Sequence, residues 1–178
     1  MALRLYDTRS RRKRIFETLV EGEVGIYVCG ITPYSPSHIG HARQAIAFDI
    51  IVRWLRKSGF LVNHITNFTD IDDKIIRIAN EENIDFLDVA NRNIDDYFEV
   101  MDLLNVNRAD SYPRVTETIP EIIDMIAKLI ENGNAYSSHD GVYFEINTAP
   151  EKYGQLTGQT LEMVREGAGG RVSETGTG

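Results

Sequence analysis

The sequence predicts an α/β fold built around a parallel β-sheet. Two apolar, β-branched segments, residues 24–29 and 60–67, flank a long amphipathic helix over about residues 38–58. Strand, helix and strand at this spacing form a βαβ crossover, so we expect parallel strands and a right-handed connection. A turn-rich loop, residues 30–37, joins the first strand to the helix. Because a helix N-terminus carries partial positive charge and free N–H groups, this junction favours anionic ligands.

The composition is that of a globular chain rather than a disordered or membrane-spanning one. Of the 178 residues, 42% are hydrophobic and 26% are charged, and no apolar run approaches the ~20 residues that cross a bilayer. Residues 1–23 lack the apolar segment of a signal peptide. A single cysteine cannot form an intramolecular disulfide. We therefore expect a reducing, cytoplasmic location and no membrane partner.

The formal charge of -8, from 19 Lys and Arg against 27 Asp and Glu, excludes a general nucleic-acid-coating protein. One dense basic run, residues 9–14, is the candidate for a local RNA contact. The more common meaning of such a run is a solvated loop or arm. Short strands are expected on either side of it, near residues 3–6 and 15–20.

The helix at residues 38–58 carries a wide apolar stripe made of two parallel rows. The rows are Ile46, Ile50 and Trp54, and Ala47, Ile51 and Leu55. A stripe of this width predicts packing against a sheet. Basic residues in the last turn and Gly59 after it are the expected stop signals.

Helical patterns dominate the next part of the chain. A polar turn at residues 69–74 opens a helix that runs to about residue 82, and Asp85 caps a longer helix with apolar residues to Leu104. A loop at residues 105–115 leads to a helix that stops at Gly133. Residues 135–137 and 142–146 form a hairpin around Asp140 and Gly141. Residues 167–178 are almost devoid of apolar side chains, which indicates a mobile loop and a fragment of a longer protein.

His38 and His41 lie three residues apart at the start of the first helix, so their side chains share one face. Three interpretations are open: a shared metal ion, ordinary surface or capping residues, and a phosphate site. Gly40 lies between the two histidines and allows a ligand to approach the backbone, which favours phosphate.

Cys29 is predicted as the last residue of the first strand, directly before the turn-rich loop at residues 30–37. A lone cysteine is most often a small buried hydrophobe, but this position also suits a nucleophile or a metal ligand. One thiol cannot complete a zinc site, which needs about four ligands. Asn67, Thr69, Asp70 and Asp73 follow the second strand at the same edge. They suit either a ligand amine, ribose or Mg²⁺, or simply a turn and a helix cap.

Several motifs occur in a fixed order along the chain. They are Tyr-Val-Cys-Gly at residues 27–30, His-Ile-Gly-His-Ala-Arg at 38–43 and Asn-Phe-Thr-Asp-Ile-Asp-Asp-Lys-Ile-Ile at 67–76. In this order they closely resemble the cysteinyl-tRNA synthetases, a family of class I aminoacyl-tRNA synthetases. Residues 116–123 and 142–144 match that family's connective region. The likeness covers about residues 3–172, and the ordered set is far more specific than any one motif.

The resemblance implies a Rossmann-like catalytic domain with an inserted connective α+β segment. Residues 1–115 would form the nucleotide-binding half, residues 116–165 the start of the insertion, and residues 166–178 a disordered tail or truncation point. It also implies a reaction of L-cysteine with ATP to give cysteinyl-adenylate, followed by transfer to tRNA(Cys). The implied cofactors are Zn²⁺ and ATP with Mg²⁺.

The resemblance also assigns residue roles. His38 and His41 are the implied catalytic residues, and together with Thr32 and Gly40 they would contact ATP. The implied substrate-binding residues are Gly30, Asn67 and Thr69, and Cys29 matches a zinc ligand. A zinc ion that takes the substrate thiolate separates cysteine from serine better than an apolar pocket, since sulfur is the softer donor.

Two departures from the family keep alternatives open. The loop at residues 30–37 resembles the related ligase of mycothiol synthesis, which joins cysteine to glucosaminyl-inositol. The family's second signature loop, Lys-Met-Ser-Lys-Ser, and the remaining zinc ligands do not occur in this sequence. We therefore expect the chain alone to complete neither zinc coordination nor efficient adenylation. A nucleotide-binding paralogue without turnover is the third interpretation.

Overall fold

The computed structural model describes residues 3–158, 160, 162 and 163, so the predicted tail at 166–178 lies outside the described residues. The chain divides into two compact units, one formed by Thr18–Pro120 and the other by Met1–Glu17 with Glu121–Gly178. The predicted domain boundary after residue 115 stays a prediction. None of the helices in the described part of the chain combines the length and hydrophobicity needed to cross a membrane.

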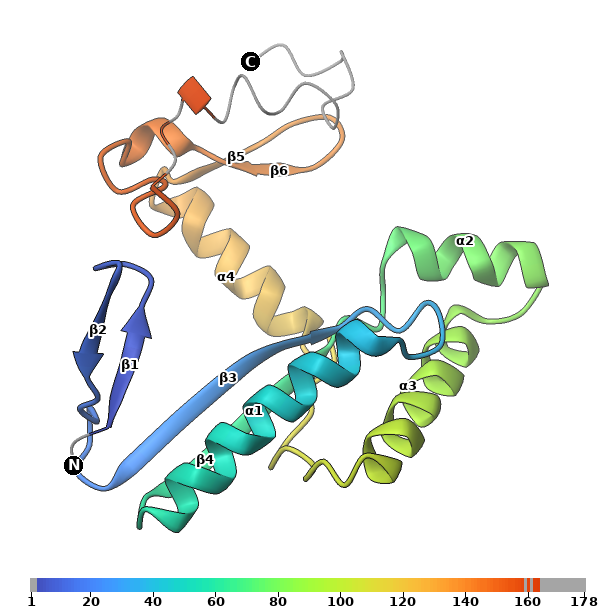
Figure 1. Ribbon diagram of the computed structural model, residues 1–178. Helices are drawn as coiled ribbons and strands as arrows, with labels where there is room; N and C mark the ends of the chain where they lie inside the picture. Colours follow the sequence, from blue (N-terminus) through green and yellow to red (C-terminus); the bar gives the residue numbers. More distant parts are fainter. Residues whose placement is uncertain (1–2, 159, 161, 164–178) are drawn as a thin grey trace. The chain divides into compact units, whose positions relative to one another are not determined.

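The unit formed by Thr18–Pro120 contains the predicted βαβ crossover (Figure 1). Its elements are β3 (Glu23–Ile31), α1 (Ile39–Lys57), β4 (Leu61–Phe68), α2 (Asp73–Glu82) and α3 (Phe86–Leu103). β3 and β4 are parallel, as predicted, and their register shifts between Val28 and Ile31. The segment after α3, predicted as a loop, runs beside the other edge of β4, where the Thr66 and Phe68 amides donate to carbonyls of residues 111 and 113.

Helix α1 has the predicted bounds, but of the predicted apolar stripe only Leu55 is buried. Its buried residues are Ala42, Asp49, Val52 and Leu55. The predicted row of Ile46, Ile50 and Trp54 is 37%, 61% and 61% exposed. The expectation that this row packs against the sheet is therefore wrong for the described residues. Asp49 is held inside by Arg53, whose Nε donates to its carboxylate at 2.7 Å.

The core of this unit lies between the carboxyl end of β4 and helix α3. Phe68 is 1% exposed and meets Tyr97 and Phe98 edge-on, and its ring stacks on Tyr112 at 5.3 Å. Burial of a side chain as large as phenylalanine contributes about 2–3 kcal/mol. A second core cluster joins α2 to α3 through Ile75, Ala79, Val89 and Ala90. Helix α3 is thereby fixed against the edge of the sheet where the site lies.

The other unit contains two antiparallel hairpins and most of helix α4 (Ile119–Glu131). The predicted hairpin is present as β5 (Ala135–Ser137) and β6 (Val142–Phe144), and a short 3₁₀ turn, Ile146–Thr148, follows it. The other hairpin consists of β1 (Arg4–Asp7) and β2 (Arg12–Ile15). The basic run is exposed, as expected, but its second half belongs to a strand, Arg12–Ile15, rather than to a loop. The second strand was expected at residues 15–20, whereas β2 ends at Ile15.

Candidate functional site

The carboxyl ends of β3 and β4 bring three predicted substrate-binding residues together. The Gly30 amide donates to the Asn67 side-chain oxygen at 2.9 Å, and the Asn67 amide group donates to the Thr69 hydroxyl at 3.4 Å. The backbone N–H of Thr69 donates to the Ile31 carbonyl at 3.0 Å. These bonds tie the end of one strand to the turn after the other. Thr32, the next residue along, is half-buried at the start of the loop.

His38 and His41 form a reciprocal cap on helix α1. The Gly40 amide donates to Nδ1 of His38 at 3.0 Å, and the His38 amide donates to Nδ1 of His41 at 3.3 Å. The two rings stack with centroids 3.7 Å apart. The capping interpretation is therefore correct as geometry. It also means that the imidazoles occupy two backbone donors that were expected to be free for a ligand.

This cap fixes which ring nitrogen carries the proton. An Nδ1 atom that accepts a hydrogen bond carries no proton, so the neutral ring bears its proton on Nε2. Burial, and then the electrostatic effect of the neighbouring His38, lowers the pKa of His41, which keeps His41 neutral near pH 7. Because both Nδ1 atoms accept hydrogen bonds, each ring has an Nε2–H donor left over. A pair of such donors at a helix N-terminus suits an anionic ligand.

Gly40 is required by the ring of His38. A Cβ atom at Gly40 would lie 2.8 Å from Cε1 and 2.9 Å from Nδ1 of that ring. Contacts this short force the imidazole out of its capping position. The glycine predicted to admit a ligand thus also makes room for the cap.

The loop before α1 is anchored on helix α3 by two residues that the sequence analysis did not identify. Asn93 is buried, and its side-chain amide donates to the carbonyls of Pro33 and Val89 at 3.2 and 2.8 Å. The Asp96 carboxylate accepts from the Ser37 amide at 2.7 Å. Each anchor joins two residues that are about sixty positions apart in the sequence, so no local sequence pattern predicts it.

Replacing Asn93 by alanine is expected to lower the free energy of unfolding by about 1–3 kcal/mol, because it leaves a buried carbonyl of the loop without its donor. Urea denaturation measures this loss as a lower midpoint with an unchanged slope. Asn80→Ala, on the exposed side of α2, is the matched control and should change stability by less than about 0.5 kcal/mol. If the two variants were equally stable, the hydrogen bonds of Asn93 would not contribute to the free energy of unfolding.

Asp70, one of the carboxylates considered as a ligand contact, is fully buried. Its two oxygens accept from the amide and the hydroxyl of Thr116, at 3.0 and 2.6 Å. Asp70 therefore has a structural role, but not as a helix cap: it holds Thr116 in place before α4, and the N-cap of α2 is Asp72. Asp73 is the first residue of α2, where a carboxylate interacts favourably with the helix dipole.

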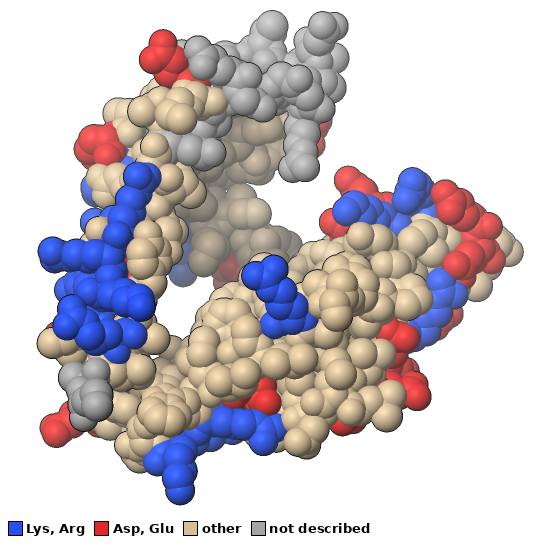
Figure 2. Space-filling view, in the orientation of Figure 1, with Lys and Arg blue, Asp and Glu red and all other residues tan. Residues whose placement is uncertain are grey.

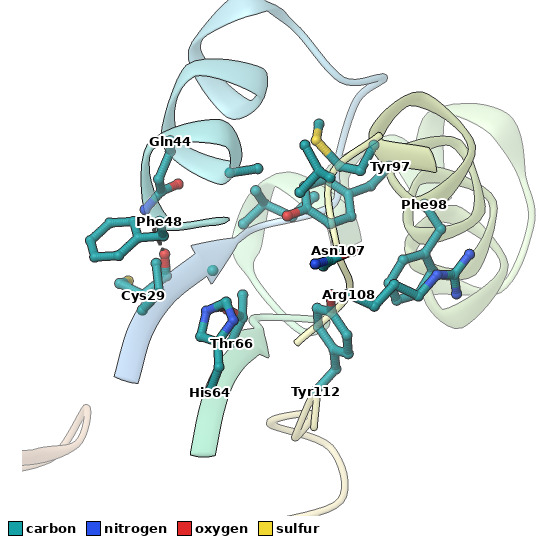
Figure 3. Close-up of a pocket in the computed structure, with 16 residues that line it drawn as sticks. Cys29, Gln44, Phe48, His64, Thr66, Tyr97, Phe98, Asn107, Arg108 and Tyr112 are labelled. Carbon is teal, nitrogen blue, oxygen red and sulfur yellow. Dashed lines mark hydrogen bonds between the residues drawn. The ribbon is translucent and has the colours of Figure 1, made fainter. Parts of the chain in front are cut away.

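Cys29 is exposed, so it is not the buried hydrophobe that a lone cysteine usually is. Its carbonyl accepts from Gln44 of α1 at 2.9 Å, and Figure 3 shows this bridge from the helix to the strand. Gln44 lies three residues after His41, so the bridge ties Cys29 to the start of the helix. Among the described residues, no group of three or more His, Cys, Asp or Glu side chains is placed to hold a metal. A zinc site therefore cannot be formed by these residues alone.

A small cavity lies behind the strand ends, between α1, the sheet and α3 (Figure 3). Its volume is about 30 Å³, which holds little more than a water molecule. It is too small for an amino acid or a nucleotide. His64 forms part of its wall; it is 8% exposed, and its Nε2 lies 3.3 Å from the Thr66 hydroxyl.

Acidification is expected to destabilise the chain through His64. Burial lowers the pKa of His64, with a smaller lowering by Arg56 and opposing effects of Asp110 and Asp49. The unfolded chain, with a histidine pKa of about 6.5, then binds more protons than the folded one. Stability is full above about pH 6.5 and is lost as the pH falls through the folded pKa. Urea denaturation from pH 7.5 to 5 should show this fall, and His64→Gln should flatten it, whereas His139→Gln at an exposed turn should not.

Most of the chain is similar to one family of known proteins. The sequence profile of the family described as tRNA synthetases class I (C) catalytic domain matches residues 15–177. The chain is 49% identical over 169 residues to a cysteine–tRNA ligase of Idiomarina loihiensis, covering 94% of this chain and 37% of that protein. It is 50% identical over 168 residues to the enzyme of the same name from Thermococcus onnurineus, covering 94% and 35%.

The chain thus spans about a third of the length of these relatives. Among solved structures, methionyl-tRNA synthetase of Mycobacterium tuberculosis in complex with methionyl-adenylate is similar, with a TM-score of 0.57 and 24% identity. The similarity covers 63% of this chain and 23% of that one. At this identity the likeness establishes the fold alone, and it agrees with the predicted Rossmann-like α/β class.

Proposed function

The chain belongs to the family of class I (C) tRNA synthetase catalytic domains, and on that premise we propose that it is the amino-terminal part of a cysteine–tRNA ligase. The proposed reaction joins L-cysteine to ATP, releases pyrophosphate and passes the cysteinyl group to tRNA(Cys). The observation that carries the proposal is the histidine cap of α1, because it leaves two Nε2–H donors beside the strand ends. Both relatives quoted above with about 50% sequence identity are named cysteine–tRNA ligases, which favours this function over a sugar ligase or a nucleotide-binding paralogue without turnover.

The chemistry needs donors that are fixed before the reaction begins. An oxygen of the cysteine carboxylate attacks the α-phosphorus of ATP, and the bond from that phosphorus to the pyrophosphate oxygen breaks. Negative charge builds on phosphoryl oxygens as this happens. His38 and His41 would donate from Nε2 to these oxygens, and Thr32 and Gly40 would line the same nucleotide site. Preorganised donors of this kind cost no reorganisation at the moment of reaction.

The cysteine substrate would lie at the ends of β3 and β4. Hydrogen bonds link Gly30, Asn67 and Thr69 there, so these residues would form a preorganised surface for the substrate. Cys29 would supply one ligand of a zinc site that binds the substrate thiolate, with the other ligands outside the described residues. A bound zinc ion would select cysteine over serine, since it stabilises the ionised thiol.

Pyrophosphate exchange tests the proposed function on the complete natural protein. Exchange of labelled pyrophosphate into ATP should require cysteine and should not occur with serine, and tRNA(Cys) should then be charged. If no exchange occurs, the remaining interpretation is a nucleotide-binding paralogue without turnover. Exchange followed by transfer to glucosaminyl-inositol, without charging of tRNA, would identify the sugar ligase.

A further inference from the structure

The hairpin of β1 and β2 concentrates positive charge in an otherwise acidic chain. Between residues 4 and 15 it carries six cationic side chains and one carboxylate, a net charge of +5. The total of -8 therefore leaves -13 for the rest of the chain. The cations are Arg4, Arg9, Arg11, Arg12, Lys13 and Arg14. Figure 2 shows Lys and Arg side chains gathered over this hairpin.

Most of this charge is not neutralised by ion pairs among the described residues. Asp7 is the hairpin's single carboxylate, and its oxygens accept from the amides of Arg9 and Ser10 in the turn. Its ion pair with Arg14 is long, at 3.6 Å. Arg12 and Lys13 form no ion pair with any other residue in the described ranges. An exposed cluster of like charges repels itself and costs stability, and a bound external anion would relieve that repulsion.

The pairing of the strands distributes the cations over both faces of the hairpin. Tyr6 is opposite Lys13, and Asp7 is opposite Arg12. Since neighbouring residues of a strand point to opposite faces, Tyr6 and Lys13 share one face and Arg12 lies on the other. Tyr6 is 62% exposed, so an aromatic ring stands open beside a cation. The rigid turn also fixes Arg11 in a left-handed conformation with φ of 52°.

We propose that the β1–β2 hairpin is an RNA-binding surface that contacts the phosphate backbone of the transfer RNA. The proposal deepens the proposed function, on which it rests for the identity of the RNA. Five of the six cations are arginines, and a guanidinium binds a phosphate with two parallel hydrogen bonds. The open ring of Tyr6 adds a surface on which a base can stack, which an acidic peptide or a lipid headgroup would not use.

Fluorescence anisotropy of labelled tRNA(Cys) with the 178-residue chain tests the proposal. Binding is expected in the micromolar range at low salt, with an affinity that falls steeply with salt concentration. The double variant Arg12→Gln, Lys13→Gln should weaken binding by about tenfold and reduce the slope of log K against log salt by about 2. Neither residue makes an ion pair within the described chain, so folding should be unaffected. The control, Lys57→Gln with Arg77→Gln, removes the same charge from α1 and α2.

Each outcome decides the proposal. A loss confined to the hairpin variant, equal for tRNA(Cys) and an unrelated transfer RNA, supports backbone contact. No detectable binding, an unchanged affinity, or an equal loss in the control overturns the proposal. The proposal is also overturned if the chain binds phosphatidylserine vesicles or polyglutamate more tightly than RNA. Pyrophosphate exchange needs no RNA, so the two proposals fail separately. If exchange occurs but the hairpin variant binds RNA with unchanged affinity, only the hairpin proposal is refuted. If no exchange occurs, only the proposed function is refuted.

Discussion

Replacing His41 by alanine is expected to slow adenylate formation by about 100- to 1000-fold, which is the usual loss for one preorganised donor. The affinity for cysteine should change by less than about threefold, because the proposed contact is with ATP. The rate is measured by pyrophosphate exchange on the complete protein, and cysteine binding by calorimetry. Equal losses in rate and in cysteine affinity would argue against a phosphate role.

Two further variants separate the capping role of His41 from its donor role. The side-chain oxygen of asparagine lies near the position of Nδ1, so His41→Asn keeps an acceptor for the His38 amide but loses the Nε2–H donor. The side-chain nitrogen of glutamine lies near the position of Nε2, so His41→Gln keeps a donor. We expect His41→Asn to be stable but slow, and His41→Gln to retain part of the rate. If both retained the full rate, the cap rather than the donor would be the function of this residue.

The central βαβ unit could be predicted because each of its signals is local. The run of apolar residues in β3, the cap at His38 and the glycine after α1 lie within a few residues of the boundaries they set. The parallel pairing then follows from the length of the connection. The cap itself was one of three open interpretations, since two histidines at this spacing suit a metal, a cap or a phosphate equally well.

The apolar row of α1 and the anchors of the loop could not be predicted, because they depend on what lies opposite. Ile46, Ile50 and Trp54 have the spacing of a buried face, but spacing does not say which residues will cover it. Asn93 and Asp96 are polar residues on a helix with no local motif, and their partners lie across the fold. Long-range contacts of this kind leave no periodic trace in the sequence.

The strand within the basic run was not predicted, because charged residues dominate the composition of this segment. Lys and Arg are not typical strand residues, so residues 12–14 suggested a solvated arm rather than a strand. The turn of the hairpin, however, had a readable signal. Asp7 followed by Arg9 and Ser10 is the pattern in which a carboxylate accepts the amides of its own turn.

Replacing Gly30 by alanine is expected to lower the free energy of unfolding by about 3 kcal/mol or more, the upper end of the cost of overpacking. A Cβ atom at this position would overlap the Asn67 carbonyl oxygen and lie 2.7 Å from the carbonyl carbon. Both atoms belong to the backbone of β4, so no side-chain rotation can relieve the contact. β3 and β4 would have to separate where the substrate-binding residues meet. Urea denaturation, or failure to recover soluble protein, measures the effect.

Gly25 provides the matched control, since it lies in the same strand and a Cβ there meets no atom within 4 Å. Gly25→Ala should therefore leave stability unchanged or slightly raised, because alanine loses less backbone entropy on folding. Asn67→Ala separates the steric effect from the hydrogen bond, since it removes the acceptor of the Gly30 amide but adds no clash. Its cost should be about 1–2 kcal/mol. If Gly30→Ala were no worse than Asn67→Ala, the close approach of the strands would not be what makes this glycine necessary.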